Sequence, residues 1–280
     1  MKTNSQIEQK QIFLHYQYLK NANLKLPSFN DTGFKVFSQN DEDGLLLYIF
    51  ALIGISNRLC LDIAFCGPQG SNTANLICNW GFHGLLIEGS LEGVNKSKKF
   101  FSNHADTRIF PPTIVNSWVT KDNINQICED NDFKGEIDLF SLDMDGIDYW
   151  IWKELTIADP KVVVVEYLDF LGPEKSLTIP YDEKFQAVHS ECPNSGEPYD
   201  YFGASLSAFV NLGRSKGYRL VGVNKYCFNA FFVKENIALD FLPEITTQEC
   251  FNHPKAKLGI NERWQRVKHL PWVNVQMRLH

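Results

Sequence analysis

Short apolar runs alternate with helix-like segments along most of the chain, from about residue 38 onward. The runs carry little internal alternation of apolar and polar residues, which is typical of strands covered on both faces. This alternation of elements predicts βαβ units and a parallel sheet. The expected strands cover residues 59–65, 84–89, 113–116, 137–146 and 161–167, and the expected helices cover residues 43–54, 72–81, 94–104, 121–130 and 148–155.

The last part of this region predicts a different connection. An amphipathic helix over 204–217 ends at a glycine and is followed by two strands within 218–234. Strands this close in sequence must pair antiparallel, because a parallel crossover needs a dozen or more residues. The pattern therefore predicts an α/β fold with a Rossmann-like, mostly parallel seven-stranded sheet and an antiparallel C-terminal hairpin. We expect an N-terminal helical extension (1–37), the Rossmann-like domain (38–236) and a C-terminal extension (237–280).

The composition and net charge argue against some classes of binding partner. The chain has 280 residues, 44% of them hydrophobic, with a formal net charge of -6. Binding to nucleic acid or anionic membranes relies on clustered Lys and Arg, so neither is the expected partner. The polar start of the sequence and the lack of a run of roughly 20 apolar residues favour a cytoplasmic protein. The seven cysteines include no C-x-x-C pair, which favours buried free thiols over a zinc or redox site.

The turn after the first expected strand is a candidate ligand loop, because ligands in open α/β sheets bind beyond the carboxyl ends of the strands. Asp62 lies in the strand, Gly67 and Gly70 free the backbone, and Asn72 stands near the next helix start. The loop lacks the G-x-G-x-x-G dinucleotide fingerprint. Residues 71–73 also suit helix capping, and we expect at least one of them to cap.

Glu88 ends the second expected strand, 26 positions after Asp62. An acid at this place in a nucleoside-binding sheet accepts hydrogen bonds from ribose hydroxyls. It therefore suggests a nucleoside cofactor, although capping of the following helix is an alternative.

The most unusual stretch is SLDMDGIDYWIW, in which Asp143, Asp145 and Asp148 fall within six residues. Such carboxylates repel one another unless a cation, a donor-rich ligand or a proton intervenes. They suit either a Mg²⁺ or Ca²⁺ site or a base that takes a proton from a substrate hydroxyl. Glu166 ends the next apolar run and is expected at the same edge of the sheet. Asp148 also suits capping of its own helix.

His189 is a further candidate base, in a long segment expected to be irregular before the last major helix. Such loops often form lids or substrate walls. Because imidazole titrates near neutral pH, His189 joins Asp143 and Asp145 as the predicted catalytic residues.

Several stretches in collinear order resemble one family. SQNDEDGLLLYIF, SNTANLICNWGFHGLLIEG, DLFSLDMDGIDYWIW, VVVVEY, YFGASLSAF and KGYRLVGV with NAFFVK are similar to the FkbM-like methyltransferases, particularly members from bacterial surface-polysaccharide gene clusters. The resemblance covers residues 38–234. It implies the Rossmann-like fold of methyltransferases that use S-adenosylmethionine (SAM), and an acceptor oxygen on a sugar or related metabolite, including nucleotide sugars.

Carried over by position, the resemblance implies specific roles. The first loop would line the methionine part of SAM, Glu88 would hold the ribose, and Asp143 would lie beside the transferred methyl group. The predicted cofactor-binding residues are Glu42, Asp62, Phe65, Gly67, Gly70, Asn72, Glu88, Gly89 and Asp143. The speculative Mg²⁺ ligands are Asp143, Asp145 and Glu166.

The first loop departs from the family pattern, since Cys66 and Pro68 stand where related sequences carry glycines. Pro68 lacks an N–H and fixes φ, which alters the backbone contacts available to a cofactor. A non-catalytic nucleotide- or sugar-binding protein is therefore an alternative, and an NAD-dependent oxidoreductase is a weaker one because its fingerprint is missing. The tail with Trp264 and Trp272 suits packing on its own domain or on a second subunit, so a homodimer is a further possibility.

Overall fold

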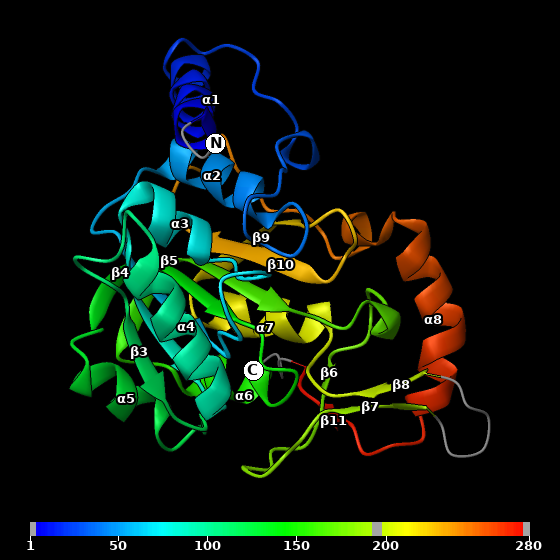
Figure 1. Ribbon diagram of the computed structural model, residues 1–280. Helices are drawn as coiled ribbons and strands as arrows, with labels where there is room; N and C mark the ends of the chain where they lie inside the picture. Colours follow the sequence, from blue (N-terminus) through cyan, green and yellow to red (C-terminus); the bar gives the residue numbers. More distant parts are fainter. Residues whose placement is uncertain (1–3, 192–197, 277–280) are drawn as a thin grey trace.

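A seven-stranded sheet forms the centre of the computed structural model, which describes residues 4–191 and 198–276 (Figure 1). The strand order is β3-β2-β1-β4-β5-β10-β9. The first five strands run parallel, and β10 pairs antiparallel with both β5 and β9. The predicted fold class is thus confirmed. The strands are β1 (Leu59–Ile63), β2 (His83–Glu88), β3 (Thr113–Asn116), β4 (Gly135–Leu142), β5 (Ala158–Glu166), β9 (Tyr218–Val223) and β10 (Asn229–Lys234).

Helices cover both faces of the sheet. α2 (Glu42–Ile53), α3 (Ala74–Trp80) and α4 (Leu91–Asn103) contribute to one hydrophobic core, and α5 (Ile124–Asp130), α6 (Asp148–Glu154) and α7 (Leu206–Ser215) contribute to the other. Strand side chains alternate between the two, so that Val162 and Val164 join the first core while Val163 and Val165 join the second. This two-sided burial explains why the strands are continuous apolar runs in the sequence.

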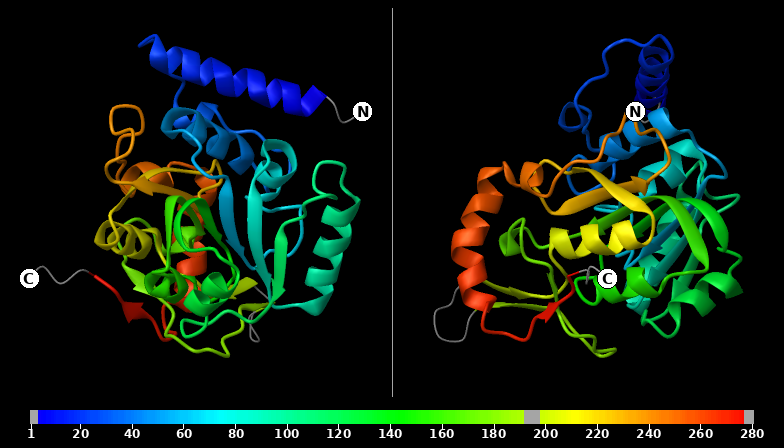
Figure 2. Two further views of the ribbon diagram at one scale, coloured as in Figure 1. Left: turned by 90° about the vertical axis from the view of Figure 1, so that its left-hand side faces the viewer. Right: turned by 180° about the vertical axis from the view of Figure 1, so that it is seen from behind.

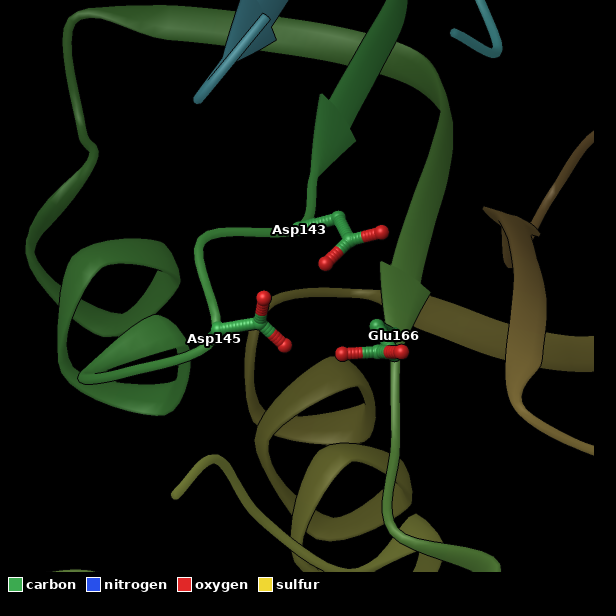
Figure 3. A group of neighbouring side chains, drawn as sticks. All are labelled: Asp143, Asp145 and Glu166. Atoms are coloured by element: carbon green, nitrogen blue, oxygen red, sulfur yellow. The ribbon is translucent and has the colours of Figure 1, made fainter. Parts of the chain in front are cut away.

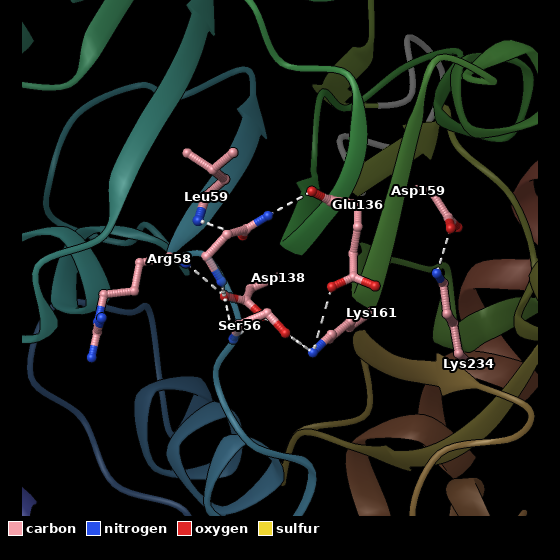
Figure 4. Close-up of polar contacts among 9 residues, drawn as sticks. Ser56, Arg58, Leu59, Glu136, Asp138, Asp159, Lys161 and Lys234 are labelled. Carbon is pink, nitrogen blue, oxygen red and sulfur yellow. Dashed lines mark hydrogen bonds and ion pairs between the residues drawn. The ribbon is translucent and has the colours of Figure 1, made fainter.

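A fully buried charged residue lies in the first half of β4, at the end of the sheet opposite the carboxyl edge. Asp138 of β4 is fully buried, and its carboxylate accepts hydrogen bonds from the backbone N–H groups of Ser56, Asn57 and Arg58 (Figure 4). Lys161 Nζ lies 3.9 Å from Asp138 Oδ1. Asp138 therefore fixes the turn between α2 and β1, because three backbone donors that lack other partners converge on one anion.

The N-terminal helix α1 (Asn4–Asn21) lies on the outer side of α2 (Figure 2). Phe13 packs into the first core and its ring lies 4.9 Å from that of Trp80. After the short helix η1 (Phe29–Asp31), the chain enters α2, where Asp43 Oδ2 accepts from the N–H groups of residues 36–38 at 2.7–2.8 Å. Asp43 thus fixes the segment that leads into the domain.

The C-terminal segment packs beside the carboxyl edge of the sheet. After η3 (Gln248–Phe251), helix α8 (Pro254–Val267) contacts η2 (Asp169–Leu171) and β8 (Pro198–Tyr201) (Figure 1). Arg263 connects the two, since it donates to Asp169 and to Asp200 at 3.1 and 2.6 Å. The short strands β6 (Leu177–Thr178) and β11 (Val273–Asn274) pair nearby.

The segment expected to be irregular instead contains an antiparallel hairpin, β7 (Val188–Glu191) with β8. Its strands are four residues each and mostly polar, so they lack the apolar run that marks a buried strand. No helix of the described residues is long and apolar enough to cross a membrane.

Candidate ligand pocket at the carboxyl edge

A pocket of about 170 Å³ opens at the carboxyl ends of β1 and β4. The strand order reverses between these two strands, and this switch point is where open α/β sheets bind ligands. Seven of the predicted site residues line it, namely Asp62, Phe65, Gly67, Gly70, Asn72, Asp143 and Asp145. Ala64, Cys66, Gln69, Ser71 and Ser141 complete the lining.

The loop after β1 adopts an unusual backbone. Ala64 has φ of 65°, in the left-handed region that favours glycine, and the N–H groups of Ala64 and Phe65 both donate to Ile87 O. Gly67 and Gly70 have φ of 136° and 94°, and a Cβ built on either would meet no atom within 4 Å. The loop therefore turns away from the sheet and leaves open space beside its backbone.

Asp62 organises the start of α3. Its Oδ2 accepts from Thr73 Oγ1 at 2.5 Å and from Ser71 Oγ at 3.1 Å. Ser71 Oγ in turn accepts from Ala74 N at the start of α3, while Thr73 at the N-cap makes no capping bond with its side chain. Burial raises the pKa of Asp62 to about 6, because the hydrogen bonds from Thr73 and Ser71 offset only part of the desolvation cost.

Among the described residues, two predicted cofactor-binding residues at this edge carry a buried acceptor atom without a hydrogen-bond donor. Asn72 Oδ1 is one, while Asn72 Nδ2 donates to Ser141 Oγ at 3.3 Å. Glu88 Oε2 is the other, while Glu88 Oε1 accepts from Ser90 N at 2.6 Å. A buried acceptor without a donor costs free energy, and such atoms are often satisfied by a ligand or by water.

Glu88 is not among the residues that line the pocket. The exposed residue Cys66 lines the pocket, and the charges of Glu88, Asp143 and Asp62 act on its thiol. Burial of the sulfur and then these charges raise the pKa of the Cys66 thiol to about 11. Pro68 is buried and does not line the pocket, so its side chain does not fill it.

Three carboxylates converge at the ends of β4 and β5. Asp143, Asp145 and Glu166 each offer one oxygen, and these oxygens lie within 4.8 Å of one another (Figure 3). Burial, and then the charges of Asp145 and Asp148, raise the pKa of Asp143 to about 8. Burial followed by the charge of Asp143 also raises the pKa of Glu166 well above its usual range. Burial and the neighbouring charges therefore favour the protonated forms of the Asp143 and Glu166 carboxyls.

Asp148 belongs to the scaffold of this turn. Its two carboxylate oxygens accept from Met144 N and Gly146 N, both at 2.9 Å, which closes the turn that precedes α6. Between them, Asp145 has φ of 49°, a conformation that Asp tolerates better than most residues. The capping alternative for Asp148 is therefore wrong, because the amides that its carboxylate binds precede α6.

Besides Glu88 and Glu166, the predicted site residues Glu42 and Gly89 are not part of the pocket lining. Glu42 is fully buried, and its Oε1 accepts from the side-chain amides of Asn224 and Asn229. Gly89 accommodates the indole of Trp118, since a Cβ there would lie 2.9 Å from Trp118 Cε3. His189 belongs to β7, and its side chain lies outside the part of the chain whose side chains the structure describes.

Ala64 and Ser141 were missed by the sequence interpretation. Ser141 precedes Asp143 by two positions, so strand alternation places both on the same face and was a usable signal. Ala64 carried no such signal, because alanine gives no indication of a positive φ.

No protein-family model and no curated protein sequence matches the chain. Solved structures similar to it include the CcbJ methyltransferase from Streptomyces caelestis, with 14% identity over 74% of this chain and 96% of that chain, at a TM-score of 0.43. Magnesium protoporphyrin IX methyltransferase from Synechocystis PCC 6803 with bound SAM has 10% identity over 69% and 77% of the two chains, at a TM-score of 0.41. At these values, function has to be inferred from the residues of the site.

Proposed function

We propose that this protein is a SAM-dependent methyltransferase that methylates an oxygen of a sugar or related small metabolite. The observation that carries the proposal is the group of carboxylates around the switch-point pocket. SAM differs from other nucleoside cofactors in carrying a positive sulfonium. Because like charges raise the free energy of the cluster, a cation in the pocket would relieve it.

The residues present fit the remaining parts of this cofactor. A pocket of about 170 Å³ is smaller than the roughly 300 Å³ of the smallest typical ligand sites, so it suits the amino-acid part of SAM rather than the whole molecule. Glu88 Oε2, buried and without a donor among the described residues, suits a ribose hydroxyl. A ribose bound at Glu88 would lie near the Cys66 thiol, on which the charge of Glu88 acts. The open backbone at Gly67 and Gly70 allows close approach.

Different residues of the chain serve different parts of the proposed reaction. When bound, the cofactor supplies an electrophilic methyl group and leaves as S-adenosylhomocysteine. Asp143 lines the pocket next to Glu166, and a sulfonium bound beside them would favour their ionised forms. Asp145 is exposed and faces the same space, so it suits the base that accepts the proton of the acceptor hydroxyl. His189 stays a second candidate for that base.

A divalent cation is the alternative occupant of the acid cluster. The oxygens of Asp143, Asp145 and Glu166 are close enough to share an ion, and oxygen ligands are those that Mg²⁺ prefers. Their use by Mg²⁺ stays a prediction. Activity that survives dialysis against a chelator would show that this prediction is wrong.

The two alternatives from the sequence are less favoured by this electrostatic environment. NAD and nucleotide sugars carry a diphosphate, which the carboxylates of Asp62, Asp143 and Asp145 would repel from the pocket. A nucleotide sugar as methyl acceptor therefore has to keep its diphosphate outside.

Calorimetric titration with SAM, S-adenosylhomocysteine and NADH tests the proposal directly. We expect SAM to bind, and Asp143→Asn to weaken SAM binding more than it weakens binding of the uncharged product. Asp122→Asn, an exposed aspartate on the surface, is the matched control. Asp143→Ala should also abolish methyl transfer. If SAM does not bind while a nucleotide sugar does, the chain is a binding protein and the proposal is wrong.

A further inference from the structure

A second pocket, of about 220 Å³, lies next to the first. The two pockets share Asp145, whose positive φ places it in the turn between β4 and α6. The described residues that line the second pocket are Trp118, Met144, Asp145, Gly146, Ile147, Phe185, Gln186 and Ala187. A molecule bound there would meet the occupant of the first pocket at Asp145.

Two aromatic side chains, Trp118 and Phe185, line the second pocket, and each also contacts residues that are not part of its lining. Trp118 Nε1 donates to Glu183 O at 2.9 Å, and the indole lies against Gly89, where any Cβ would collide with it. Even so, Trp118 is 52% exposed, which is unusual for so large an apolar group. The ring of Phe185 packs edge-to-face on Tyr201 at 6.1 Å. Both side chains are therefore fixed before any ligand binds.

In both pockets the charged side chains of the described lining are acidic. Asp145 is the single charged side chain among the described residues that line it. Asp143 and Glu166 lie close behind Asp145. A ligand anion placed there would face the Asp145 carboxylate, and like charges repel.

The volume limits the ligand to one ring. A cavity of about 150 Å³ holds benzene, so about 220 Å³ holds a six-membered ring with a few small substituents. Apolar ring faces stack on aromatic side chains, and both sugars and aromatic compounds present such a face.

We propose that the second pocket is the acceptor site, and that it accepts an uncharged or cationic hydroxylated ring, with one face against Trp118 and Phe185, while it rejects anionic rings. This inference rests on the proposed function. In the transfer, the hydroxyl oxygen forms a bond to the methyl carbon and the carbon–sulfur bond breaks, with its electron pair going to sulfur. The hydroxyl proton passes to Asp145, and the products are a methyl ether and S-adenosylhomocysteine.

The test follows the indole N–H signal of Trp118 in the full chain labelled with ¹⁵N-tryptophan. Trp118→Phe assigns that signal, and Trp264→Phe on α8 is the matched control for loss of a half-buried indole. The probes are methyl β-D-glucoside, which is neutral, and methyl β-D-glucuronide, which differs by a carboxylate. Catechol serves as a neutral aromatic ring. SAM binding is measured separately by calorimetry.

We expect at least one neutral probe to shift the Trp118 signal, and the glucuronide to bind about tenfold or more weakly than the glucoside at low salt. Asp145→Asn should reduce that discrimination. If only catechol shifts the signal, the ring is aromatic and the sugar assignment fails, although the acceptor site stands. If SAM binds and no probe affects Trp118, or if the anion binds equally well, this inference is wrong and the proposed function survives. If a neutral ring binds but SAM does not, the acceptor role fails together with the proposed function.

Discussion

Replacing Asp62 with asparagine should stabilise the protein at neutral and alkaline pH. The amide oxygen can still accept from Thr73 Oγ1 and Ser71 Oγ, so the hydrogen bonds at the start of α3 are retained while the charge is removed. The pKa of Asp62 is raised from 3.8 to about 6, so the folded state holds its proton where the unfolded state has lost it. Stability from this group is therefore lost as pH rises from about 4 to 6, and the loss amounts to about 3 kcal/mol.

Urea unfolding at pH 4 and pH 8 measures this effect. Relative to the native chain, Asp62→Asn should have a nearly unchanged free energy of unfolding at pH 4 and a gain that approaches about 3 kcal/mol at pH 8. The exposed Asp122→Asn controls for the general loss of one negative charge, and it should show no such pH dependence. An equal effect of Asp62→Asn at both pH values, or a loss of stability at pH 8, would refute the reasoning about burial.

Three further perturbations test other parts of the structure. Asp138→Ala should cost about 1.5–3 kcal/mol in urea unfolding, because three backbone N–H groups and Lys161 lose a buried charged acceptor, whereas the half-exposed Glu136→Ala should change little. Ala64→Gly should stabilise the chain by about 0.5–1 kcal/mol in the same assay, since it relieves a positive φ; a destabilised variant would show that this backbone is unstrained. In a Cys192→Ser background, SAM should slow maleimide labelling of Cys66, monitored by mass spectrometry; labelling at an unchanged rate would contradict the place given to the ribose.

The sheet was predictable because each buried strand is a contiguous apolar run. For β3, the predicted and observed ranges coincide at 113–116, and the antiparallel pairing of β9 and β10 followed from their short connection. The hairpin of β7 and β8 was not predictable, since its strands are short and mostly polar and β8 packs on α8, which lies far along the chain. Asp138 is a similar case, because its role depends on a turn about 80 positions away.

The sequence indicated the acidic part of the pocket better than its aromatic neighbour. Asp62, Asp143 and Asp145 end apolar runs, so the rule that ligands bind at the carboxyl ends of strands was enough to group them. Trp118 and Phe185 come from connections after β3 and β6. No periodicity links such loops, and their meeting at one pocket depends on tertiary packing.

The cost of the acid cluster is the strongest physical reason to regard this edge as functional. Burial raises the pKa of Asp62, Asp148 and Asp143 alike, so each carboxylate is less stable in the folded protein than in water. For Asp148 and Asp62, the hydrogen bonds that fix the turn and the helix offset part of this cost. Asp143 lines the pocket and fixes neither that turn nor that helix. The negative charge of Asp145 makes the ionised form of Asp143 still less stable. A group that weakens the fold and faces a cavity is explained most simply by a positively charged ligand that binds there.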